Sequence, residues 1–165
     1  MNPPLRYPQD QEALWSSVAD GTLDVVSTDH VPRKFQAKKG NIWECSAGFP
    51  GTATLLPVIL SEGYHKRGLG LSRIAELLSE NPARLFNLYP RKGTLALGSD
   101  ADLTVVDLDK VREVRADELE SYSDYSLYDG WKLAGWPVLT MVRGEVVMDG
   151  GELTGKAGYG RFMPR

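Results

Sequence analysis

Apolar side chains recur at helical spacing in the first part of the chain. Between positions 9 and 20 this spacing predicts an amphipathic helix, which Gly21 should end. A second apolar stretch over 52–60 predicts a buried helix that Pro57 could kink.

Two more helices are expected further along the chain. Ser72 is the expected N-cap of a helix that carries Ile74 and Leu77 on one face. Asn81 and Pro82 are expected to begin a separate helix, because proline suits the first helical position.

A short β-branched run lies between the first two helices. Residues 23–27 predict a buried strand, and Asp29 and His30 follow at its carboxyl end before Pro32. Small residues over 46–51 then predict a turn. The order is therefore helix, strand, and polar residues at the end of that strand.

About ninety residues into the chain, helical spacing gives way to short apolar runs between glycine and aspartate turns. Arg143 and Gly144 predict a tight hairpin, and a β-rich unit begins near Arg91. Tyrosines and tryptophans between 111 and 136 predict a long loop packed on another surface, and 155–165 should be an extended tail. Strands are predicted over 94–97, 103–106, 138–142 and 145–148.

The composition is that of a globular protein. Of 165 residues, 42% are hydrophobic and 25% are charged, with a formal net charge of -3. This length fits one domain or two small ones and excludes a complete (β/α)₈ barrel of about 250 residues. The acidic balance argues against nucleic acid as a partner. No apolar run approaches the roughly 20 residues of a membrane span, and no apolar leader follows Met1, so we expect a cytoplasmic protein without membrane association.

Asp29 is the strongest candidate for chemistry. A carboxylate at the carboxyl end of a buried strand lies where α/β folds place catalytic groups, and it could bind a metal or transfer a proton. The alternative is an ordinary Asx turn over 29–32, which the spacing alone favours. His30 and His65 are the only histidines, and neither His-x-His nor His-Glu-x-x-His is present. The chain alone therefore does not encode a normal hydrolytic zinc site.

Several segments occur in an order shared with one group of enzymes. They are the proline-rich start at 2–6, the Asp-His-x-Pro ending at 29–32, the Asn-Pro-Ala-Arg run at 81–84, the glycine-rich passage into Ala-Asp at 93–102, and the tail at 158–165. Together they resemble the C-terminal part of the cyclic amidohydrolases: dihydroorotase, hydantoinase, dihydropyrimidinase and allantoinase. The start favours dihydroorotase, whereas the tail favours hydantoinase or dihydropyrimidinase.

The resemblance implies a fold and its division into domains. The fold is α/β: the C-terminal fragment of a metal-dependent-hydrolase TIM barrel, with its last strand and helices, plus part of the small β-sandwich domain. Residues 1–90 would belong to the barrel, and 91–165 would form β-sandwich strands and the C-terminal tail. The family's other metal ligands lie in earlier barrel strands, so we expect a fragment that is inactive as an isolated chain.

The resemblance also implies roles for individual residues. In the family a metal-bound hydroxide attacks a ring amide, and Asp29 matches the catalytic aspartate that contacts the metal and passes the proton to the leaving nitrogen. Ala47 and Gly48 match the loop whose backbone binds the substrate ring. Arg33 stands where dihydroorotases carry a histidine, and it could bind an acidic substrate.

The resemblance further implies a cofactor and partners. The cofactor is one or two zinc ions in the full-length family, which should be absent from this chain alone. The substrate is a small cyclic amide or imide, and the protein should be a homo-oligomer. The alternative hypothesis is a non-catalytic amidohydrolase-like protein that acts through assembly.

Overall fold

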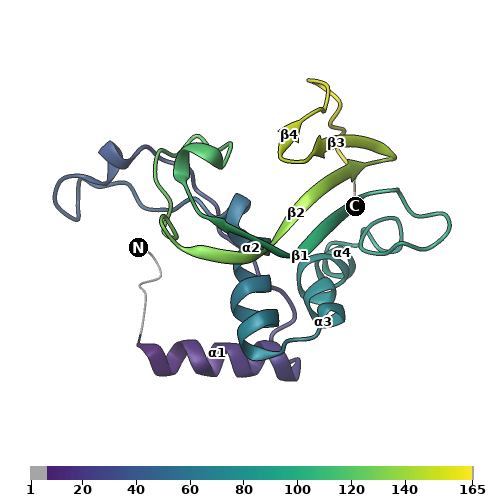
Figure 1. Cartoon of the computed structure of the whole chain (residues 1–165), viewed down its shortest axis with the longest axis horizontal. Helices are drawn as coiled ribbons and strands as arrows, with labels where there is room; N and C mark the ends of the chain where they lie inside the picture. The colour runs from purple at the N-terminus through teal and green to yellow at the C-terminus, as the bar shows by residue number, and fades with distance from the viewer. Residues whose placement is uncertain (1–6, 165) are drawn as a thin grey trace.

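The computed structural model describes residues 7–164, so the family-like start at 2–6 lies outside it. Its first helix is α1 (Pro8–Asp20), which confirms the helix predicted over 9–20. Gly21 follows in the left-handed conformation, with φ 89°, and ends the helix as predicted. The helix lies at one end of the molecule, beneath the other helices (Figure 1).

The second helical stretch is longer than predicted. It runs without a break through η2 (Thr52–Thr54), α2 (Leu55–Val58) and the π-type helix η3 (Ile59–His65). Pro57 lies within α2, and the stretch continues through this residue although proline donates no backbone hydrogen bond. The stretch packs against α1 through Trp15, whose ring lies close to the Cα of Gly63.

The third helical stretch is continuous through the position where a new helix was expected. It comprises α3 (Leu71–Ala75), the π-type helix η4 (Glu76–Glu80) and α4 (Asn81–Leu85). An α-helix does begin at Asn81 with Pro82 in its first turn, as predicted, but it continues directly from η4 and is not a separate helix. Ser72 is not the N-cap, since Gly70 occupies that position.

The β unit is one antiparallel sheet in the order β1-β2-β3-β4. Its strands are β1 (Leu103–Glu113), β2 (Lys132–Val142), β3 (Glu145–Asp149) and β4 (Glu152–Leu153). Arg143 and Gly144 connect β2 to β3 with φ values of 47° and 82°, and this pair of positive φ angles confirms the predicted tight hairpin. The strands predicted over 103–106, 138–142 and 145–148 are all present, and each is longer than predicted, the last by one residue.

The strand predicted over 94–97 is not formed. These residues adopt irregular and turn structure, and the side chains of Leu95 and Leu97 are exposed. Residues 94–97 have no partner strand among residues 7–164. A pattern of alternating apolar residues forms a strand only when a neighbouring strand pairs with it. The predicted aromatic loop is also shorter than expected, because Trp136 lies within β2.

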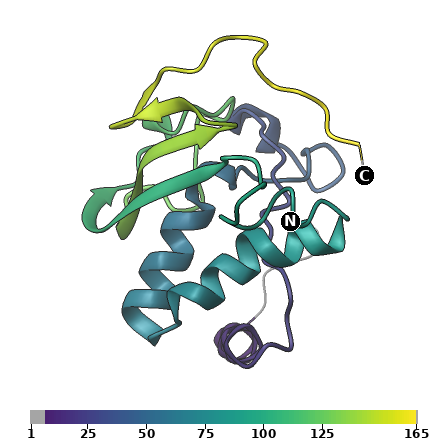
Figure 2. The same cartoon turned by 90° about the vertical axis from the view of Figure 1, so that its right-hand side faces the viewer.

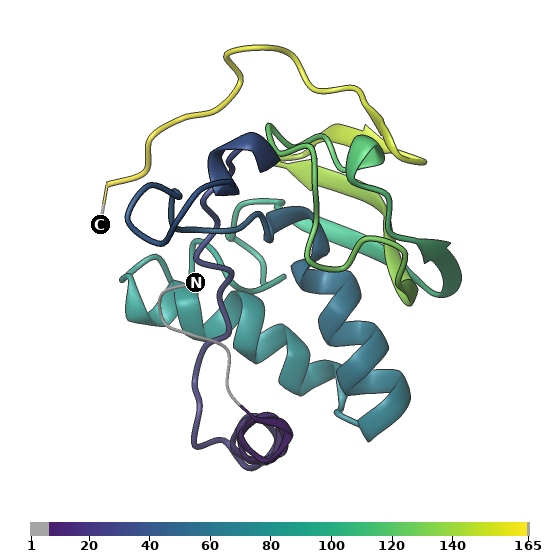
Figure 3. The ribbon, with the colours of Figure 1, turned by 90° about the vertical axis from the view of Figure 1, so that its left-hand side faces the viewer.

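The helices cover one side of the sheet, as Figures 2 and 3 show, and the tail after β4 arches away from it. Both α2 and η3 contact β2, and the approach of η3 is close. Gly135 approaches Leu60, and the Ser61 hydroxyl accepts a hydrogen bond from the Ala134 N–H at 3.3 Å. Two apolar clusters lie at this boundary: one around Leu77 that includes side chains of β1, and one around Leu133 that includes Val58.

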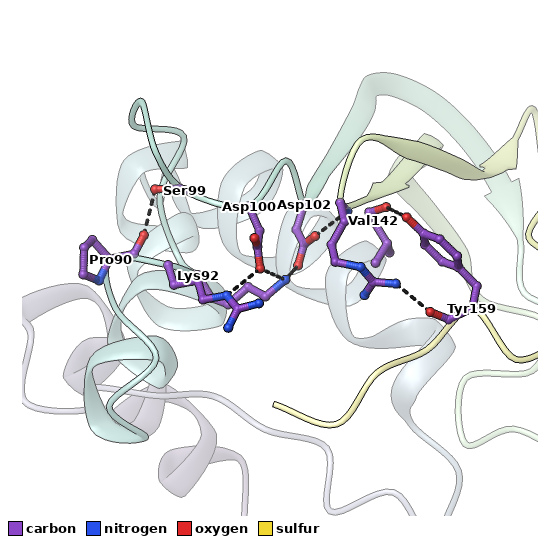
Figure 4. Close-up of polar contacts among 9 residues, drawn as sticks. Pro90, Lys92, Ser99, Asp100, Asp102, Val142 and Tyr159 are labelled. Atoms are coloured by element: carbon purple, nitrogen blue, oxygen red, sulfur yellow. Dashed lines mark hydrogen bonds and ion pairs between the residues drawn. The ribbon is translucent and has the colours of Figure 1, made fainter. Parts of the chain in front are cut away.

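A polar network joins the segment after α4 to the β unit and to the tail (Figure 4). Lys92 forms ion pairs with Asp100, at 3.0 Å, and with Asp102. Asp102 also accepts a hydrogen bond from the Arg143 N–H at 2.7 Å, and the Arg143 guanidinium donates to the Tyr159 carbonyl at 2.6 Å. Burial by itself lowers the pKa of Lys92, but the two carboxylates outweigh it and raise that pKa. The network therefore fixes the hairpin and the tail to the segment that follows α4.

None of the helices in the described part of the chain has both the length and the apolar character that a membrane span requires.

Candidate active site

The segment that leads to Asp29 is extended but does not form the predicted buried strand. Its backbone is held by the helices instead: the Leu23 carbonyl accepts from Arg73 at 2.6 Å, and the Asp24 carbonyl accepts from Asn81 at 2.8 Å. Within residues 7–164 no parallel strand lies beside it, and a barrel strand is defined by such neighbours. The segment is extended, as its apolar pattern indicates, but the predicted strand is not formed because residues 7–164 provide no neighbouring strand for it.

Asp29 lies at a sharp turn at the end of this segment. Its φ of 46° is in the left-handed region, which aspartate tolerates better than most residues. Its side chain is exposed and makes no hydrogen bond or ion pair with any other residue that the structure describes. The alternative of a carboxylate engaged in an Asx turn is therefore not observed, and the carboxylate is available for a ligand.

His30 ties this turn to the loop over 46–51. Its Nδ1 accepts hydrogen bonds from the N–H groups of Gly51, at 3.0 Å, and Thr52, at 3.3 Å. One residue further, the Val31 N–H donates to the Phe49 carbonyl at 2.9 Å, and His30 and Phe49 form an isolated parallel bridge. These contacts place Asp29 and the 46–49 loop on adjacent segments.

The 46–49 loop requires glycine at one position. Gly48 has φ 93°, and a Cβ added there would lie 2.4 Å from the Cβ of Val31. Only glycine permits this conformation and this close approach together. Ala47 is exposed, and its N–H and C=O, like the N–H of Gly48, have no hydrogen-bond partner among residues 7–164. The loop therefore presents both a donor and an acceptor to a ligand.

Arg33 lies on the segment after Pro32, where the backbone is held by the aromatic loop. The Arg33 N–H donates to the buried Ser123 hydroxyl at 3.0 Å, and the Phe35 N–H donates to Asp124 at 2.7 Å. The Arg33 side chain is exposed and makes no hydrogen bond or ion pair within the described chain. Hydrogen bonds therefore fix the Arg33 backbone, whereas its guanidinium has no partner among residues 7–164.

Tyr125 of the aromatic loop packs on both segments of the candidate site. Its ring meets Phe35 and Phe49 edge to face, with ring centroids 5.7 and 6.2 Å apart. Burial, and to a smaller extent the Asp124 charge, raise the pKa of Tyr125. The short 3₁₀ helix η5 (Ala116–Glu118) opens this loop. The expectation that the aromatic loop packs on another surface is met here, and that surface is the site itself.

The donor set for a metal is incomplete in the described residues. No three histidine, cysteine, aspartate or glutamate side chains gather at one place in residues 7–164. Both histidines are engaged elsewhere, His30 as an acceptor from backbone N–H groups and His65 with the Leu108 carbonyl at 2.9 Å. Asp29 could supply one metal ligand, but these residues do not fit a complete metal site.

The described chain is α/β: helices and an extended segment that ends at Asp29 are followed by a small antiparallel β unit, as expected for the last part of an α/β barrel with an attached β domain. The sequence profile described as "Amidohydrolase family" matches residues 4–147, and the chain belongs to this family. The predicted fold class is confirmed.

Similar proteins in this family carry hydantoinase names. The L-hydantoinase of Paenarthrobacter aurescens is 40% identical over 99% of this chain, and the D-phenylhydantoinase of Escherichia coli O1:K1 / APEC is 39% identical over 100%. The solved D-hydantoinase (dihydropyrimidinase) from Thermus sp. matches 98% of the chain with 34% identity and a TM-score of 0.94. The chain spans only 36% or 37% of the length of these relatives.

Proposed function

We propose that this chain is the C-terminal part of a hydantoinase- or dihydropyrimidinase-type enzyme that hydrolyses a ring amide in a cyclic amide or imide. The match extends over nearly the whole chain and includes relatives named as L- and as D-hydantoinases. This supports the hydantoinase-like tail as the better guide to the subfamily, ahead of the dihydroorotase-like start.

The proposal rests on the pairing of His30 with Phe49. This pairing places the Asp29 carboxylate beside the 46–49 loop, in which the Ala47 N–H and C=O have no hydrogen-bond partner among residues 7–164. We assign to Asp29 the transfer of a proton from the attacking water to the leaving ring nitrogen. Ala47 and Gly48 would bind the ring through their backbone, because an N–H and a C=O side by side complement the amide groups of the ring. Arg33 would contact an acidic substituent, when the substrate has one.

The domain division is also a proposal. Residues 1–90 would belong to the barrel, since every helix from α1 to α4 lies there, and 91–165 would form the β domain and its tail. Apolar side chains from both parts share the clusters around Leu77 and Leu133, so the two parts would unfold together. The cytoplasmic location stays a prediction.

Zinc is the proposed metal of the whole enzyme, as one or two ions. Because residues 7–164 hold no cluster of ligands, the isolated chain should bind zinc weakly and below stoichiometry. Elemental analysis after gel filtration measures the zinc content. About one tightly held zinc per chain, lost on Asp29→Ala, would contradict the expectation, since a structural or catalytic site usually needs about three or four ligands.

The isolated chain should self-associate, as a homo-oligomer. Its extended segment before Asp29 lacks strand neighbours, β1 is an open edge strand of the sheet, and several large apolar side chains are exposed. Analytical ultracentrifugation at micromolar concentration should show species larger than the 18.2 kDa chain. Val105→Lys on the edge strand should reduce the association, because an edge lysine opposes strand pairing. A monodisperse 18.2 kDa species would count against the proposed association.

A chimaera tests the proposed function directly. In the L-hydantoinase of Paenarthrobacter aurescens, the segment that aligns with this chain is replaced by residues 1–165 of this chain. The folded chimaera should open the hydantoin ring, whereas the relative without the segment and the isolated chain should not. A chimaera that folds and assembles like the relative but has no turnover on hydantoins or dihydrouracil would refute the proposal.

A further inference from the structure

The candidate substrate loop is held from behind by a lysine. Lys38 ends the short 3₁₀ helix η1 (Phe35–Lys38) and is half-buried. Its ammonium donates hydrogen bonds to the carbonyl of Ser46, at 2.7 Å, and to the carbonyl of Gly48. It also lies 4.4 Å from the centre of the Phe49 ring, a cation–π distance.

The two carbonyls that Lys38 binds flank Ala47. In a trans peptide the N–H points opposite to the C=O of the same plane, so fixing the Ser46 carbonyl on Lys38 turns the Ala47 N–H the other way. The same holds for the peptide that follows Gly48. The Ala47 C=O and the Gly48 N–H belong to the peptide between these two fixed planes. Neither of them, nor the Ala47 N–H, has a hydrogen-bond partner among residues 7–164.

Lysine suits this role better than arginine or a neutral residue. One ammonium nitrogen has three donors and can reach two carbonyls that converge on a point, whereas a guanidinium presents a planar fork. Charged donors also make stronger hydrogen bonds than neutral ones. Within residues 7–164 Lys38 forms no ion pair, so the carbonyls and the Phe49 ring are the groups that receive its charge.

We propose that Lys38 is a positioning residue, which holds the 46–49 loop so that the Ala47 and Gly48 peptide groups keep one orientation toward the substrate ring. The proposal rests on the proposed function, in which this loop binds the ring. Lys38 does not touch the substrate and acts only through the loop.

Amide hydrogen exchange on the isolated full chain tests the first half of the proposal. In Lys38→Met the amides of Val31, Ser46 and Gly51 should exchange faster on the order of tenfold, because each of these hydrogen bonds has its donor or its acceptor in the loop that Lys38 holds or next to it. Lys39→Met removes an exposed neighbouring charge and should leave these rates unchanged. Amides of η3 serve as an internal reference: unchanged rates there show that the chain has not unfolded.

The chimaera with the L-hydantoinase tests the second half. Lys38→Met should raise KM for hydantoin on the order of tenfold with a smaller change in kcat, and Lys38→Arg should recover part of the loss because charged donors remain. Loop exchange that does not change in Lys38→Met, or a KM that does not change when the loop is loosened, overturns the proposal. If the unmodified chimaera has no turnover, the proposed function fails, while the exchange experiment still decides whether Lys38 holds the loop.

Discussion

Asp29→Asn in the chimaera should lower kcat at least about 100-fold while the chimaera remains folded and assembled, because positioned proton transfer contributes typically 10² to 10⁴ to rate. Asparagine keeps the shape of the side chain and removes the basic oxygen. The exposed carboxylate has no partner among residues 7–164, so its replacement breaks no contact within the described chain and should leave stability nearly unchanged. Steady-state kinetics on hydantoin, with a thermal melt of each variant, measures both quantities.

Asp24→Asn is the matched control for this loss of turnover. Asp24 is an exposed aspartate on the same extended segment, and the bond it makes, from Asn81, goes to its backbone carbonyl, not to its carboxylate. Its replacement should change kcat less than twofold, as expected for a surface charge away from the reacting atoms. An Asp29→Asn chimaera with near-normal kcat would remove Asp29 from the mechanism, and equal losses in both variants would indicate a general charge effect.

Gly135→Ala should lower the free energy of unfolding by about 2–5 kcal/mol. The backbone at Gly135 has φ 91°, and adopting a left-handed conformation costs an L-residue roughly 1–2 kcal/mol. The new methyl group would also lie 2.7 Å from the Cβ of Leu60, a buried residue of η3. Overpacking at such a contact typically costs about 1–3 kcal/mol, because the helix must move away from the sheet. Urea unfolding monitored by circular dichroism gives the difference.

Gly144→Ala separates the two causes. Gly144 has a similar φ, 82°, but no atom lies within 4 Å of its added Cβ. This variant should therefore lose only the conformational part, about 1–2 kcal/mol. If the two variants are equally destabilised, the close contact of η3 with β2 contributes nothing, and the account of how the helices attach to the sheet is wrong.

Local signals in the sequence were sufficient for several elements. Gly21 ends α1 because glycine readily adopts a left-handed conformation, so the end of the helix could be predicted from this residue alone. The β2–β3 hairpin was likewise predictable from Arg143-Gly144 between two apolar runs. Asp29 was a candidate from its place after an apolar extended segment, whereas the family resemblance supplied the fold class, the role of Asp29, and Ala47 and Gly48 as substrate-binding residues.

Other features depend on partners that sequence spacing does not show. The 23–27 segment has the apolar pattern of a strand, but strand formation needs neighbours that residues 7–164 do not provide. The roles of His30 and Lys38 were missed because each binds backbone groups of a loop 8 to 22 residues away. Ser123 was missed for the same reason, since it meets Arg33 across 90 positions. Lys38 gave a weak signal, as a lysine in a polar loop shortly before a glycine-rich turn.

The most direct test of the central claim is a crystal structure of the chimaera with a bound hydantoin-type ligand. The claim is that Asp29 and the 46–49 loop face one substrate. We expect the Ala47 N–H and C=O to lie about 3 Å from polar atoms of the ring, which is hydrogen-bond distance, and the Asp29 carboxylate to face the ring carbon that water attacks. A ligand bound elsewhere in the chimaera, with the Ala47 peptide groups turned away from it or paired within the protein, would contradict the account.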